Sequence, residues 1–112
     1  MSLARGVELF NAGRYWDAHE AWEEAWMPDR RGPDSGFYKG LIQVAAGCLH
    51  YGRRNRRGAV NKWRSGTAYL RPYLPRHRGL ELAPLVAHVD ACLAAMEREA
   101  WPALEMPLIQ AG

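Results

Sequence analysis

One segment, residues 37–52, sets strong limits on the architecture of this chain. Apart from Lys39, Gln43 and His50, its residues would be apolar on every side of a helix. A helix of this composition is stable only when other helices enclose it. The sequence therefore predicts a central helix with further helices packed around it.

Four other segments have apolar residues at three- and four-residue steps, which is the helical period. We expect a short helix ending near residues 11–13, and longer ones at about 15–27, 59–70 and 84–100. Pro28, Pro72 and Pro102 mark helix ends, and Pro84 suits a first helical turn. The tail after Pro102 is too rich in proline for a helix and too apolar to be free, so we expect it to lie across the bundle.

No segment alternates like a strand, and no hairpin dipeptide is present. The predicted fold class is therefore all-α: a compact single-domain bundle of about five helices with an extended C-terminal tail packed across it. Residues 75–79 are expected to form an exposed loop. At 112 residues the chain fits one helical domain, residues 1–112.

The composition favours an ordinary globular protein, because 48% of the residues are hydrophobic and 24% are charged. No apolar run approaches the ~20 residues that span a bilayer, and the first residues carry charges, so we expect no membrane partner and a cytoplasmic location. Cys48 and Cys92 each lie among apolar residues of expected helices, which predicts free thiols. Homo-oligomerisation is left open.

The expected second helix combines aromatic and ionisable residues on one face. On a helical wheel its three tryptophans share a sector of about 120° with His19 and Glu23. A lone carboxylate in an apolar setting costs several kcal/mol, so Glu23 needs a hydrogen-bond partner, a cation or a proton. His19, one turn earlier, is the nearest candidate, and Glu20 would lie at the rim.

The central helix offers complementary groups. Gln43 and His50 are seven residues apart and so share a face, beside Gly40 and Gly47. We expect this small-residue stripe to receive the tryptophan face of the second helix. The result would be a ligand pocket between the second and third helices, lined by six residues: His19, Glu20, Glu23, Trp26, Gln43 and His50.

Such a pocket suits a small polar ligand or a divalent metal. Within it, His19, Glu23 and His50 could bind zinc, iron or manganese. The spacing matches neither the zinc-protease pattern, where Glu23 would have to be a second histidine, nor the Glu-x-x-His of di-iron bundles. Neither Ser65 nor Cys48 has a base at an evident position, so nucleophilic catalysis gains no support.

Two other interpretations stay open. The same histidines and glutamate could form a core hydrogen-bond network in a non-enzymatic structural or interaction module. Alternatively, the loop Arg53–Arg57 and the run Arg76, His77 and Arg78 could form a nucleic-acid-binding edge, although basic loops are more often solvated surface. Of the loop arginines, Arg56 and Arg57 precede a helix, where backbone dipoles do not favour cations.

Three motifs follow one another in a specific order. They are Phe10-Asn11-x-Gly13-x-Tyr15-Trp16-x-x-His19-Glu20-x-x-Glu23-x-x-Trp26, then Gly40-Leu41-Ile42-Gln43-x-Ala45-Ala46, then Asn55-x-x-Gly58-Ala59. With them the chain resembles the bacterial and archaeal domain of unknown function 309 family over residues 7–70. The resemblance implies a small helical bundle centred on the His-Glu motif and no established reaction, cofactor or partner. It carries family-characteristic positions onto His19, Glu20, Glu23, Trp26, Gln43, Asn55 and Gly58.

Overall fold

Every expected helix is present in the computed structural model, which describes residues 2–112 and all of their side chains except that of Asp29. The five α-helices are α1 (Leu3–Asn11), α2 (Tyr15–Trp26), α3 (Ser35–Gly52), α4 (Arg56–Leu70) and α5 (Leu82–Arg98). Short 3-10 helices, η1 (Met27–Asp29) and η2 (Arg71–Tyr73), follow α2 and α4. The prediction of an all-α bundle with about five helices is confirmed.

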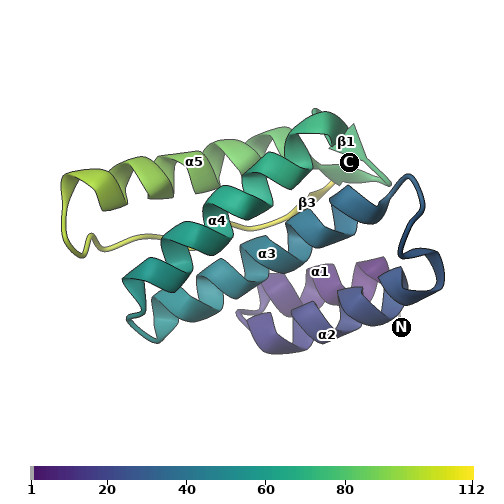
Figure 1. The fold of residues 1–112 in the computed structure, drawn as a ribbon, viewed down its shortest axis with the longest axis horizontal. Helices are drawn as coiled ribbons and strands as arrows, with labels where there is room; N and C mark the ends of the chain where they lie inside the picture. Colours follow the sequence, from purple (N-terminus) through teal and green to yellow (C-terminus); the bar gives the residue numbers. More distant parts are fainter. Residues whose placement is uncertain (1) are drawn as a thin grey trace.

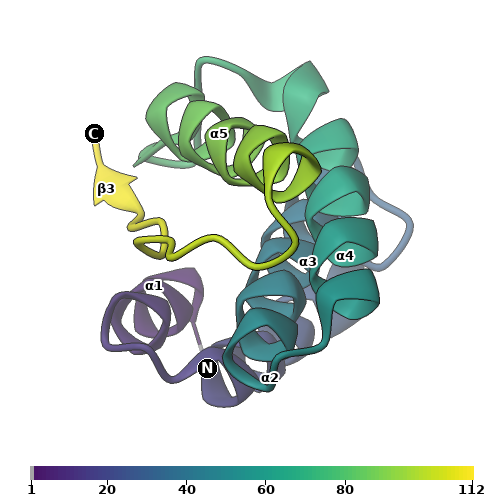
Figure 2. The ribbon, with the colours of Figure 1, turned by 90° about the vertical axis from the view of Figure 1, so that its left-hand side faces the viewer.

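The helices follow one another around the bundle in sequence order. Helix α3 lies between α2 and α4, while α1 packs on α2 and α5 packs on α4 (Figure 1). Seen from the end, this arrangement leaves a gap between α1 and α5, and the C-terminal segment runs through that gap (Figure 2). The tail thus covers the side of the core that the helices leave open (Figure 2).

Helices α3 and α4 pack very closely because glycines meet bulky side chains across their contact. A Cβ atom added at Gly47 would lie 2.3 Å from the Trp63 ring, and one added at Gly40 would lie 2.5 Å from Leu70. Trp63 and Leu70 are fully buried there. The expected stripe of small residues is therefore real, but it receives α4 rather than the tryptophans of α2, so that prediction is wrong.

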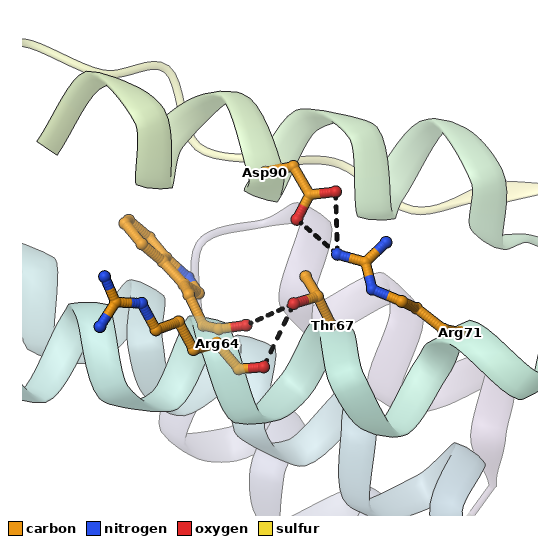
Figure 3. A network of polar contacts seen from close by, with 5 residues as sticks. Arg64, Thr67, Arg71 and Asp90 are labelled. Carbon is orange, nitrogen blue, oxygen red and sulfur yellow. Dashed lines mark hydrogen bonds and ion pairs between the residues drawn. The ribbon is translucent and has the colours of Figure 1, made fainter. Parts of the chain in front are cut away.

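The contact between α4 and α5 is partly polar (Figure 3). The guanidinium of Arg71, just after α4, donates to both carboxylate oxygens of Asp90 on α5, at 2.9 and 3.1 Å. The buried Thr67 hydroxyl donates back to the carbonyls of Trp63 and Arg64, which satisfies it inside α4. The polar groups of this contact are thus paired.

Polar contacts attach the tail to helices α1 and α3. The Asn11 side chain exchanges two hydrogen bonds with the backbone of Ile109, at 2.9 and 2.8 Å. The Tyr51 hydroxyl donates to the Pro102 carbonyl and accepts from the Leu104 N–H. The expected placement of the tail across the bundle is confirmed.

Three very short strands were not expected. They are β1 (Arg76–His77), β2 (Leu80–Glu81) and β3 (Gln110–Ala111), which form an antiparallel sheet in the order β1-β2-β3. The segment 75–79 is therefore only partly the exposed loop we expected, since β1 lies within it. Two-residue strands are too short to show any alternation in the sequence.

Both cysteines are buried free thiols, as predicted. Burial raises the pKa of Cys48 to about 12 and raises the pKa of Cys92 as well. Neither thiol is a ready nucleophile at neutral pH, because the thiolate is the reactive form. Across residues 2–112, no helix combines the length and apolar character that crossing a membrane requires.

Candidate functional site

The buried face of α2 differs from the predicted one. Ala18, Ala21 and Trp22 are buried, whereas the Trp16 side chain is 54% exposed. Small alanines allow α2 to approach its neighbours closely, and a helix held between α1 and α3 has two covered sides rather than one. The helical wheel placed the tryptophans together but could not show which side the neighbours would cover.

His19 and Glu23 do form a pair, at the edge of the core. The distance from His19 Nδ1 to Glu23 Oε2 is 3.4 Å, and the two side chains are 24% and 49% exposed. The Trp16 ring stacks on the imidazole, with centroids 5.2 Å apart and an interplanar angle of 8°. Nδ1 of His19 is buried and makes no hydrogen bond among the described residues. With Glu23 half in solvent, the pair has little of the desolvation cost of a core network.

The structure places Gln43 and His50 with α4 instead. Gln43 lines a groove with α4 residues, and His50 contacts Asn55 and the backbone of Gly58 at the turn into α4. Among residues 2–112, no group of three or more His, Cys, Asp or Glu side chains could hold a metal ion. The predicted triad of His19, Glu23 and His50 is therefore not assembled, because α4 rather than α2 covers the polar side of α3.

Asn55 orders the turn between α3 and α4. Its Oδ1 accepts from the Gly58 N–H at 3.0 Å, which caps α4, and its Nδ2 lies 3.1 Å from Nδ1 of His50. Because Oδ1 is the acceptor, Nδ2 is the donor, so Nδ1 of His50 accepts and a neutral His50 carries its proton on Nε2. A Cβ atom at Gly58 would lie 2.6 Å from the imidazole. This geometry explains the Asn55-x-x-Gly58 pattern.

The outer side of the α3–α4 contact forms an open polar groove of about 400 Å³. Seven residues line it: Gln43, Asn55, Arg57, Gly58, Asn61, Lys62 and Ser65. Two of them are cationic, four are uncharged hydrogen-bonding side chains, and none of these described lining residues is acidic. Only Gln43 was among the six pocket residues that the sequence suggested.

Three of the other expected pocket residues, Glu20, Glu23 and Trp26, line two different hollows near the end of α2. Glu20 and Glu23 line an acidic one with Glu24 and Met27. Trp26 lines a basic one with Arg30, Arg31 and Lys39. The single pocket expected between α2 and α3 is thus replaced by separate acidic and basic surfaces.

The arginines of the loop Arg53–Arg57 have different environments. Arg56 donates to the carbonyls of Met96, Glu99 and Ala100, which caps the C-terminal end of α5. Arg54 lies over the Trp101 ring at 4.6 Å. Arg54 and Arg56 therefore hold the end of α5 and the start of the tail. Of Arg56 and Arg57, which backbone dipoles do not favour, only Arg57 lines the groove.

The second basic run is also engaged internally. Arg76 donates to Glu81 at 2.9 Å, and His77 and Arg78 both contact the carboxylate of Asp34. Nε2 of His77 lies 2.7 Å from Asp34 Oδ1. These hydrogen bonds hold the pKa of Asp34 below its ordinary value. Sequence reasoning missed Asp34, because a partner 43 residues away leaves no local signal.

The chain is also compared with known proteins. The model of DUF309, a domain of unknown function, matches residues 3–61, which is just over half of the chain. The chain belongs to the DUF309 family. The matched DUF309 region contains α1, α2, α3 and the start of α4, and so includes His19, Glu23, Gln43 and Asn55. No curated protein matches the chain.

Proposed function

We propose that this DUF309 protein binds a small polar anion in the groove between α3 and α4. The observation that carries the proposal is the set of side chains around the groove. Arg57 and Lys62 supply positive charge. The side chains of Gln43, Asn61 and Ser65 supply directional hydrogen bonds, and none of the described lining residues is a carboxylate. Such a lining favours an oxyanion over a cation.

The size and openness of the groove fit a small ligand. Its volume of about 400 Å³ lies at the lower end of ordinary ligand sites. Since the groove is open to water, the bound ligand keeps part of its hydration and its charge contacts are screened by salt. We therefore expect modest affinity that weakens as the ionic strength rises.

The proposal keeps the small-ligand class expected from the sequence but moves it from the α2–α3 contact to the α3–α4 contact. Glycines allow α3 and α4 to touch along their inner side, and the groove lies along the outer side. The chemistry proposed is binding, since the lining supplies charge and hydrogen bonds; neither of the two buried thiols is among the lining residues.

Isothermal titration calorimetry with inorganic phosphate, ribose 5-phosphate and ribose tests the proposal. We expect ribose 5-phosphate to bind, phosphate to bind more weakly, and ribose to give no signal. Lys62→Gln should weaken ribose 5-phosphate binding by about tenfold, the usual worth of a charge-assisted contact. The matched control is Arg64→Gln, because Arg64 lies on the same helix outside the groove and pairs with Glu97. Absence of binding by both phosphates, or an equal loss in the two variants, would overturn the proposal.

A further inference from the structure

A cation lies between two aromatic rings where α2, α3 and α4 come together. Nζ of Lys39 on α3 lies 5.8 Å from the ring centroid of Trp26 on α2 and 5.7 Å from that of Tyr69 on α4. The guanidinium carbon of Arg30 lies 5.3 Å from the same Trp26 ring. Two positive groups are thus held against one indole.

Trp26, Arg30 and Lys39 line the basic hollow, which has a volume of about 380 Å³. Its lining is Trp26, Arg30, Arg31 and Lys39, so three of four described lining residues are cations and none is acidic. No ion pair within the described part of the chain joins Arg30, Arg31 or Lys39 to a carboxylate. Like charges that line one hollow repel, and cation–π contacts offset part of that repulsion.

Trp26 has a second unusual property. Its indole Nε1 is buried and has no hydrogen-bond partner among the described residues. A buried donor without an acceptor is costly, and tryptophan N–H groups usually find a partner when buried. Within the described residues, the hollow therefore combines cations that have no carboxylate partner with a lining indole that has no acceptor, and an oxyanion would supply the missing negative charge.

We propose that the basic hollow is a second anion site, which takes a compact oxyanion of the phosphate type. An anion bound there would draw Arg30 and Lys39 from the ring onto its oxygens, since charge-assisted hydrogen bonds are stronger than cation–π contacts. Because two cations lie over the Trp26 ring, the site favours a small oxyanion over a planar ligand that would stack.

This site is separate from the α3–α4 groove, with which it shares no lining residue. Lys39 nevertheless lies one helical turn before Gln43 on α3, so the two sites are neighbours. The inference does not depend on the groove, because different cations carry the two sites.

The test follows the indole N–H signals of ¹⁵N-labelled protein as inorganic phosphate is added, with chloride at equal ionic strength as a control. Trp26→Phe identifies the Trp26 signal. We expect that signal to move in a saturable way with phosphate only. Arg30→Gln and Lys39→Gln should each weaken the apparent affinity about tenfold. Lys62→Gln, which alters the groove, should leave the titration of the Trp26 signal unchanged.

Three results would overturn the second site. The first is a Trp26 signal that stays still while phosphate is added. The second is an equal response to chloride, and the third is a response that survives both Arg30→Gln and Lys39→Gln. Thermal unfolding of each variant checks that it is folded, and the use of two cation variants on different elements keeps the test valid if one of them unfolds. Loss of groove binding with a retained Trp26 response would reject the first site alone.

Discussion

The inner and outer sides of the α3–α4 contact differ in how closely the two helices pack. On the inner side, glycines at positions 40 and 47 make room for Leu70 and Trp63, whose side chains are fully buried. On the outer side, Gln43 and the polar residues of α4 stand apart around an open groove. The comparison teaches that close backbone packing on one side can leave polar side chains such as Lys62 and Ser65 facing an open groove on the other.

The ends of this helix pair carry charged residues that are paired with other parts of the fold. At the turn into α4, Arg56 is committed to the carbonyls of α5, and at the start of α3, Asp34 is committed to His77 and Arg78. Charged groups at the ends thus make contacts that stabilise the fold, whereas Lys62 and Arg57 on the outer side line the groove. Four substitutions test this division.

The largest loss of stability should come from Gly47→Ala on the inner side. The added Cβ would lie 2.3 Å from the fully buried Trp63 ring, so the helices must separate. Overpacking should outweigh the gain in helix propensity and lower the free energy of unfolding by about 2 kcal/mol. The control is Gly52→Ala, where nothing lies within 4 Å of the added Cβ and a gain of up to about 1 kcal/mol is expected. Equal effects in urea unfolding would contradict the tight inner contact.

Arg56→Ala should have the next largest effect. It leaves three carbonyls at the end of α5 without their donor, so we expect a loss of about 1–2 kcal/mol. Hydrogen exchange should rise first in the last turn of α5. Arg57 is the next residue and lines the groove, so Arg57→Ala should change the free energy of unfolding by less than about 0.5 kcal/mol. A reversed order would show that the arginines have been assigned to the wrong roles.

Asp34→Asn should lower stability by about 1 kcal/mol at neutral pH. Because the folded-state pKa of Asp34 lies below its ordinary value, the wild-type carboxylate contributes stability above about pH 4 and loses it as the pH falls through the folded-state pKa. The difference between wild type and Asp34→Asn should therefore shrink in acid. Chemical unfolding at pH 7 and pH 3 measures it, and a difference that grows in acid would contradict the assigned contacts.

Glu23→Gln should have the smallest effect, about 0.5 kcal/mol or less, because an exposed helical ion pair contributes little. Glu20→Gln on the same helix serves as its control. If Glu23→Gln alone costs more than about 2 kcal/mol in thermal or urea unfolding, His19 and Glu23 belong to a core network rather than to an exposed ion pair.

Local sequence signals were sufficient for most of the fold. The apolar residues 37–52 predicted a central helix. Apolar residues at helical steps predicted a helix at about 59–70, and in α4 the residues Ala59, Trp63, Gly66 and Leu70 are buried. The small sheet left no such signal, because β3 pairs with β2 across about 30 residues and each strand is two residues long.

The candidate site was harder to predict because it depends on which helix covers which face. Periodicity placed Gln43 and His50 on one side of α3. Both do lie near Asn55 at the turn into α4, since Gln43 lines the groove with Asn55 and His50 contacts its side chain. It could not show that the glycines beside them would receive Trp63 rather than the tryptophans of α2. The groove residues Asn61, Lys62 and Ser65 look like ordinary helix surface until α3 is packed beside them.

The most direct test of the anion-binding groove is a titration of the side-chain amide signals of Gln43 and Asn61 with ribose 5-phosphate. Both residues line the groove from different helices. The account predicts that both signals move together and saturate, and that Lys62→Gln shifts the midpoint about tenfold higher. Unmoved amides at concentrations where calorimetry shows saturation would contradict it, because the ligand would then occupy another part of the protein.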